Sequence, residues 1–293
     1  MEYIQCAIDG FEKDKKTKSV KSDLKFAVKS VTEIKNVNTD SVSKAGIYIT
    51  YDLKKTLADC RADFIKSFGM DILSLAKSCI KLETVLVVGL GNSSFECDRL
   101  GSIVASKITV TRGREYVVQN VLESKRLRRH NNNKNKIAVC RAVPEVLSKT
   151  GINSGEFVEG ICDKIKPDLI IVCDTLCTLS AGRINNSFQL SDAGIKPGGG
   201  VGVETGDISK ESLNIPVIAI GVPLVLKTSG LIFDFLSAYE SKAGRRVDME
   251  RYGQMVLSQS AKYVTPKDID FVVEQTAEVI AKAIDFAFGN CQE

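Results

Sequence analysis

Two aspartates follow apolar, β-rich runs of the sequence and are candidates for acid–base chemistry. Asp174 ends the run 169–173, and Asp98 follows the run 84–88 after a short glycine-containing turn. A carboxylate at the rim of a buried strand loses solvation, which raises its pKa. Two such groups at neighbouring strand ends can share a proton, so that one activates water and the other protonates a leaving amine. Taken alone, Asp98 is better explained as a helix N-cap, but together the two aspartates favour a catalytic pair.

A glycine-rich segment and one asparagine complete the candidate site. The segment 192–202 is dense in glycine, and its exposed N–H groups could bind a peptide backbone or stabilise an oxyanion. A mobile surface loop explains the same composition equally well. Asn92 lies just past the end of the run 84–88. We expect substrate contacts from Asn92, Asp192, Gly198, Gly199 and Gly200.

Several other chemistries are disfavoured by the residues that the chain lacks. His130 is the single histidine, and it lies in the basic, Asn-rich segment 125–136. A Ser-His-Asp or Cys-His site would have to recruit this loop residue, and a zinc site with two histidines is impossible. Cys173 and Cys177 have no histidine partner, which disfavours thiol catalysis. We expect no metal and no cofactor.

The glycines after the first apolar run resemble part of a dinucleotide-binding fingerprint, but the match is incomplete. The third glycine of G-x-G-x-x-G would fall at Ser94. We therefore interpret Gly89 and Gly91 as a tight turn between a strand and a loop.

Three apolar runs separated by helical patterns predict the architecture. The runs 84–88, 169–173 and 216–220 have the composition of strands buried on both faces. Their arrangement favours an α/β fold, a three-layer sandwich with a mostly parallel sheet, whose functional groups gather at the carboxyl ends of the strands. Residues 1–35 are Lys-rich with a weak core pattern, so we expect an N-terminal arm or propeptide followed by a single catalytic domain over 36–293.

Composition bounds the class of protein. The chain has 293 residues, 44% of them hydrophobic, which is enough for a sizeable core. Its N-terminus lacks the pattern of a secretory signal, and no run is long enough to span a membrane. Nine cysteines without paired short spacings indicate reduced thiols in the cytoplasm. A net charge of +4 is too mild to predict direct binding of nucleic acid.

Several separate motifs resemble the germination protease family of endospore-forming bacteria, in the order in which that family has them. They cover most of the chain from about residue 84 onward. The matching segments are 87–92, 98–101, 167–176, 183–185, 191–198, 215–223 and 264–267.

The resemblance implies a phosphorylase/hydrolase-like fold, shared with hydrogenase maturation proteases. It implies an atypical aspartic endopeptidase that degrades small acid-soluble spore proteins during germination. Members are made as zymogens and assemble as tetramers in the cytoplasm of the spore. The two essential aspartates of the family correspond to Asp98 and Asp174, and the processing region corresponds to Asp23 and Leu24.

The chain departs from the family pattern around the first aspartate. Cys97, Arg99 and Ser102 stand where the family has Pro, Ala and Pro, which indicates a divergent member. Lys25 and Lys29 replace acidic residues expected after the processing region.

Three alternatives compete with this interpretation. In peptidyl-tRNA hydrolase, a strand is also followed by Gly-Leu-Gly-Asn. That enzyme requires a histidine shortly after the motif, and none is present here. A metal-dependent maturation protease could use Asp98 and Asp174 as ligands, which a chelator would reveal. A catalytically degenerate binding protein could retain the same fold.

Overall fold

The computed structural model describes residues 4–5, 18–35, 44–113, 137–197, 206–244, 248 and 262–289. The predicted substrate-binding residues Gly198, Gly199 and Gly200 lie outside these ranges, as do His130 and the basic segment around it.

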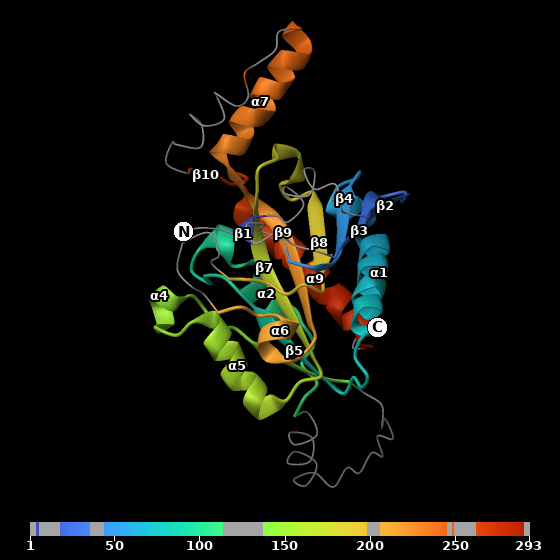
Figure 1. Cartoon of the computed structure of the whole chain (residues 1–293), viewed down its shortest axis with the longest axis vertical. Coiled ribbons are helices and arrows are strands. Elements are labelled where there is room, and N and C mark those ends of the chain that lie inside the picture. The colour runs from blue at the N-terminus through green and yellow to red at the C-terminus, as the bar shows by residue number, and fades with distance from the viewer. Residues whose placement is uncertain are drawn as a thin grey trace.

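The described residues form one ten-stranded mixed sheet, shown in Figure 1. Eight strands follow one another in the order β2-β3-β4-β8-β9-β7-β5-β6, while β1 pairs with β7 and β10 pairs with β9. The strands are β1 (Ile4–Gln5), β2 (Lys18–Asp23), β3 (Ala27–Ile34), β4 (Gly46–Leu53), β5 (Thr84–Gly89), β6 (Ala138–Ala142), β7 (Leu169–Thr178), β8 (Ser187–Ser191), β9 (Val217–Lys227) and β10 (Tyr263–Val264).

The α/β class predicted from the sequence is confirmed, and the sheet has two halves of different character. Strands β9, β7, β5 and β6 pair in parallel, and they include the three apolar runs. Strands β2, β3, β4 and β8 pair antiparallel and join β9. Of this second half, the sequence indicated only β4, through the alternation of residues 46–51. The other strands lack a continuous apolar run: β2 is exposed throughout, and β8 is short and contains polar residues.

Helices cover both faces of the sheet and make three layers (Figure 1). The helices α1 (Leu57–Ala76), α2 (Leu100–Lys107) and α9 (Ile269–Ala287) pack on one face around the larger core. The helix α5 (Ser154–Ile165) packs on the other face through Val158 and Cys162. The short helical segments are η2 (Glu96–Asp98), α4 (Leu147–Thr150), η3 (Ala181–Arg183) and α6 (Lys210–Leu213).

The larger core follows from two helices whose apolar residues recur at helical spacing. In α1, Phe64, Phe68 and Ile72 are fully buried, and the two phenylalanine rings stack with their centroids 4.9 Å apart. They meet Phe188 of β8, with the Phe64 and Phe188 centroids 4.5 Å apart. Burying side chains of this size contributes about 2–3 kcal/mol each, so this cluster anchors the antiparallel half of the sheet to the helical layer.

The helix α7 (Thr228–Ala243) behaves differently, because it projects from the body of the domain in Figure 1. Gly230 is its only buried residue. Large apolar side chains on it are exposed: Leu231, Ile232, Phe235 and Tyr239. No described helix combines the length and apolar character needed to cross a membrane.

The prediction that residues before 35 contribute little to the core is wrong for β3 and the residue before it. Strand β3 pairs with β4 along its whole length, and Phe26 and Ala27 belong to the main core. The whole of residues 1–35 therefore cannot be a separate arm. Strand β2 differs, because all six of its residues are exposed, so a leader that ends near Asp23 is compatible with the fold.

Candidate active site

Three glycines allow the start of α2 to lie directly against the ends of β5 and β7. A Cβ on Gly89 would come within 2.1 Å of the Gly101 carbonyl oxygen, and one on Gly101 within 2.2 Å of the Cys173 carbonyl oxygen. Gly91 has φ +97°, and its Cβ would lie 1.9 Å from the Asp98 carbonyl oxygen. Any larger residue would push η2 and α2 away from the sheet, so these glycines determine where Asp98 lies.

Asp98 is buried at the end of η2, above the carboxyl end of the parallel strands. Its Oδ2 accepts a hydrogen bond from the Asn92 backbone N–H at 2.9 Å. It does not cap α2, because the N-cap position belongs to Arg99, which makes no side-chain capping bond. The helix-cap explanation of Asp98 is therefore wrong, and the carboxylate instead closes the loop that leaves β5.

Asp174 lies inside β7, next to the point where β5 ends. Its side chain is 7% exposed, and its Oδ1 accepts the N–H of Thr175 at 2.8 Å. On the other side, β9 places Gly221 opposite Asp174. A Cβ on Gly221 would come within 2.5 Å of the Leu176 side chain, so Leu176 covers the place that a larger residue there would occupy.

The two carboxyl groups are electrostatically coupled. Burial raises the pKa of Asp98 from its usual 3.8 to about 6, against the opposing effect of the Asn92 N–H. Burial and then the charge of Asp98 raise the pKa of Asp174 well above its usual value. Burial and the charge of Asp98 therefore favour the protonated form of Asp174. One ionised and one protonated carboxyl group is the combination that a base and an acid require.

A third carboxylate near the pair was missed by the sequence interpretation. Glu145 raises the pKa of Asp98 through its charge. Burial opposes the ionisation of Glu145, but hydrogen bonds from Ser93 and Lys149 outweigh it and lower its pKa. Lys149 Nζ also reaches the Ser94 hydroxyl at 2.7 Å, which ties this group to the loop before Asp98.

The backbone of Glu145 has φ 61°, an uncommon conformation for a residue with a side chain. The residue follows β6 and is far from the two aspartates in sequence. No sequence pattern marked it, because its position depends on the pairing of β6 with β5.

The structure brings Asn92 to the pair and leaves Asp192 away from it. The Asn92 side chain accepts the Ser94 N–H at 3.0 Å and stabilises the turn. Asp192 Oδ1 accepts the Ile47 N–H at 2.6 Å, at the end of β8. Gln189 and Asp174 pair with the same residue of β9, Gly221, and β8 runs antiparallel to β7. Asp192 follows Gln189 in the chain and therefore lies toward the amino ends of the parallel strands, away from Asp174. Substrate contacts from either residue stay predictions.

Of the predicted processing residues, Asp23 ends β2 and Leu24 begins the turn between β2 and β3. Leu24 N–H donates to the Ala27 carbonyl at 2.9 Å, and the exposed Asp23 forms an ion pair with Lys54. This turn is at the surface, while the strand that follows it is part of the core. Processing at this position stays a prediction.

The thiols near the pair are unsuited to nucleophilic catalysis. Cys173 and Cys177 are fully buried, and burial raises the pKa of the Cys173 thiol. A thiol needs a lowered pKa to act as a nucleophile near neutral pH. Among the residues that the structure describes, no group of three or more His, Cys, Asp and Glu side chains is arranged to hold a metal ion.

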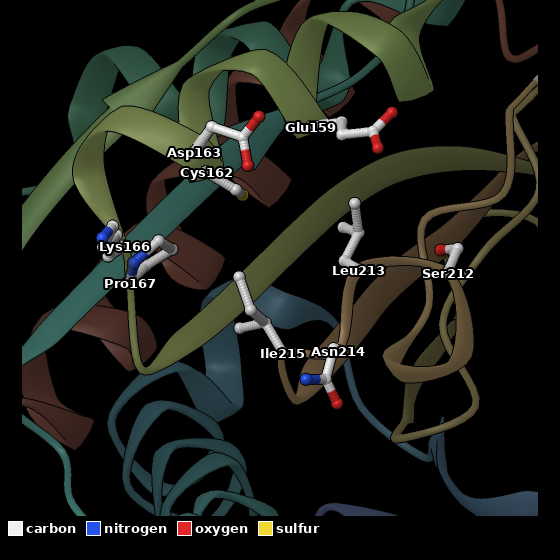
Figure 2. A pocket seen from close by; sticks show the side chains of 9 residues that line it. All are labelled: Glu159, Cys162, Asp163, Lys166, Pro167, Ser212, Leu213, Asn214 and Ile215. Atoms are coloured by element: carbon white, nitrogen blue, oxygen red, sulfur yellow. The ribbon is translucent and has the colours of Figure 1, made fainter.

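A pocket of about 320 Å³ lies at the other edge of the sheet (Figure 2). Pro167 and Ile215, which line it, lie two residues before β7 and β9, so the pocket is at the amino ends of the strands. Its charged lining residues Glu159, Asp163 and Lys166 come from α5 and the residue after it. The pocket is thus separated from Asp98 and Asp174 by the length of the parallel strands.

An α/β fold with two buried carboxyl groups at the carboxyl edge of its sheet is compatible with an enzyme that hydrolyses by acid–base chemistry. The family model described as germination protease matches residues 5–260. The chain belongs to the germination protease family, and it is a protease that acts in spore germination.

Individual relatives agree with this assignment. A germination protease of Clostridium acetobutylicum is 35% identical over 272 residues, which cover 85% of this chain and 80% of that protein. A germination protease of Clostridium perfringens strain 13 is 30% identical over 305 residues, with coverage of 96% and 88%. Among solved structures, the [NiFe] hydrogenase maturation protease HycI from Thermococcus kodakarensis is 16% identical with a TM-score of 0.33. That match covers 72% of this chain and 99% of the other, and it is too slight to bear on the chemistry.

Proposed function

We propose that the chain is an endopeptidase that cleaves small acid-soluble spore proteins with Asp98 as general base and Asp174 as general acid. The observation that carries this proposal is the burial of both carboxyl groups at the carboxyl end of β5 and β7, where the charge of Asp98 acts on Asp174. Burial raises the pKa of Asp98 to about 6, and burial together with the charge of Asp98 raises the pKa of Asp174, so we assign the base to Asp98 and the acid to Asp174.

The reaction needs only a water molecule and the peptide. The ionised Asp98 takes a proton from water, and the resulting hydroxide adds to the peptide carbonyl carbon. Asp174 gives its proton to the amide nitrogen as the C–N bond breaks, which releases a carboxylic acid and an amine. The pair again holds one proton, now on Asp98, and its transfer to Asp174 restores the starting state.

The substrate and setting follow from the family. Relatives named germination protease support a role in the spore, and we propose the spore cytoplasm as the location. We further propose a homotetramer that is made as a zymogen, as the resemblance implies. The residues Cys97, Arg99 and Ser102 around Asp98 differ from the family pattern and are the first candidates for altered cleavage specificity.

The test is incubation of the purified chain with a small acid-soluble spore protein, followed by mass spectrometry of the fragments. Wild-type protein is expected to produce discrete fragments, and the Asp98→Asn and Asp174→Asn variants are expected to produce none. Cleavage at the wild-type rate by either folded variant would refute the pair. Loss of cleavage in all three proteins would refute the proposed substrate.

A further inference from the structure

Strand β7 changes neighbours along the edge that faces β5. Up to Cys173 it pairs in parallel with β5, which ends at Gly89. Beyond that point, the described residues that continue this edge belong to β1, which pairs in parallel with Leu176 and Cys177. The opposite edge of β7 is held by β9 as far as Thr178, so β1 must lie on the β5 side.

The catalytic pair lies in the interval between these two partners. The Leu90 N–H donates to the Cys173 carbonyl at 2.9 Å, which is the last backbone bond from the β5 side. The Thr175 N–H donates to the carboxylate of Asp174 itself at 2.8 Å. From its amino end to its carboxyl end, this edge of β7 therefore borders first β5, then the two carboxyl groups, and then β1.

We propose that the edge of β7 at Leu176 and Cys177 is the position where substrate binds, as an added parallel strand, and that β1 holds this position in the free chain. The inference rests on the proposed function. Pairing through backbone groups binds an extended peptide with little demand on its side chains, which suits a protease that must accept a protein segment. The pairing of Ile4–Gln5 demonstrates that the edge accepts a parallel strand.

The register of such a strand fixes which part of the substrate it holds. In a parallel pair, the residue two positions before the partner of Leu176 lies level with Asp174, about 7 Å back along the strand. Toward its amino end, the peptide meets the end of β5 and the loop that carries Asp98. It must leave the sheet there. The strand therefore holds the residues on the carboxyl side of the cleaved bond, and the amino side is held less tightly.

The first experiment removes backbone donors from the substrate one at a time. A synthetic peptide spanning a bond that the chain cleaves in a small acid-soluble spore protein is N-methylated at single positions on either side of that bond. N-methylation at the positions that pair with Leu176 and Cys177 is expected to lower kcat/KM about fivefold per lost hydrogen bond. The same change on the amino side is expected to have a smaller effect. Equal sensitivity on both sides, or none on the carboxyl side, would overturn the proposal.

The second experiment weakens the strand that occupies the edge. Replacing Ile4 and Gln5 together with proline removes both backbone N–H groups of β1, while replacing both with alanine keeps them. If β1 competes with substrate, the proline pair raises kcat/KM about fivefold or more, and the alanine pair gives a much smaller rise. Equal rates in the proline and alanine pairs, with the fold intact by circular dichroism, would show that β1 does not occupy the substrate position. Absence of cleavage in every protein would instead refute the proposed function, and this inference with it.

Discussion

Replacing Asp98 with asparagine is expected to stabilise the protein while it abolishes cleavage. The pKa of Asp98 rises from 3.8 to about 6 on folding, mainly because of burial. A difference of about 2 pH units corresponds to about 3 kcal/mol between the folded and unfolded states. The asparagine side chain is neutral in both states, and its Oδ1 can still accept the Asn92 N–H. The variant should therefore recover up to about 3 kcal/mol of the free energy of unfolding at neutral pH.

The pH dependence of this gain follows from the two pKa values. At a pH well below 3.8, Asp98 is protonated in both states, so the wild type and the variant should be equally stable. As the pH rises to about 6, the unfolded wild type loses its proton and the folded form retains it, so wild-type stability falls relative to the variant. Above about pH 6 both forms are ionised and the difference is constant.

The assay is urea unfolding of the wild type and of Asp98→Asn at several pH values between about 4 and 7, analysed by linear extrapolation. Asp63→Asn serves as the control, because Asp63 is an exposed aspartate on α1. It should leave the free energy of unfolding unchanged within about 0.5 kcal/mol. A variant less stable than the wild type at neutral pH would refute the reasoning, since Asp98 would then be stabilised as an anion.

Four other outcomes test the site. Cleavage should decline as the pH falls through about 6, because Asp98 is then protonated and cannot accept a proton from water; a rate that is flat down to about pH 4 contradicts its role as base. In Glu145→Gln that decline should move to lower pH, since the charge of Glu145 raises the pKa of Asp98; an unchanged pH–rate profile rules out the coupling. Removal of residues 1–23 should raise activity on a spore protein, and any cleavage between Asp23 and Leu24 should disappear in Asp98→Asn if it is autocatalytic; equal rates before and after removal leave β2 without an inhibitory role. A chelator should leave cleavage unchanged, and a loss restored by a divalent metal would favour the metal-dependent alternative.

The parallel half of the fold could be predicted because its strands are buried on both faces. The runs that became β5, β7 and the start of β9 are continuous stretches of apolar, mostly β-branched residues. Strands of this kind meet at one edge of a parallel sheet, which is why two residues so far apart in sequence as Asp98 and Asp174 could be expected together.

The antiparallel half was missed apart from β4, which the alternation of residues 46–51 indicates, because its sequence carries little of this signal. All residues of β2 are exposed, and most of β3 is only partly buried. Strand β2 is held by backbone pairing with β3, and β3 by backbone pairing with β4 and by contacts from Phe26 and Ala27. Backbone pairing is independent of side chains, so it leaves no periodic pattern in the residues.

The surroundings of the pair were predictable only in part. The glycines at 89 and 91 were interpreted as a tight turn. Both lie where the backbone of η2 and the start of α2 approaches so closely that a side chain would not fit. Glu145 was not predicted, because it reaches the site through the position of β6 and through bonds to Ser93 and Lys149. Contacts of this kind depend on the tertiary structure, and one sequence does not reveal them.

The exposed strand β2 also affects how readily the protein associates with copies of itself. It is an outer strand of the sheet, and its lysines at 18 and 21 place positive charge on an edge that could otherwise pair with another molecule. Cleavage after Asp23 would expose β3 as the new edge, where Val28 and Val31 are only partly buried. Removal of β2 would replace a positively charged edge strand with a more apolar one, so the processed protease should self-associate more readily than its precursor.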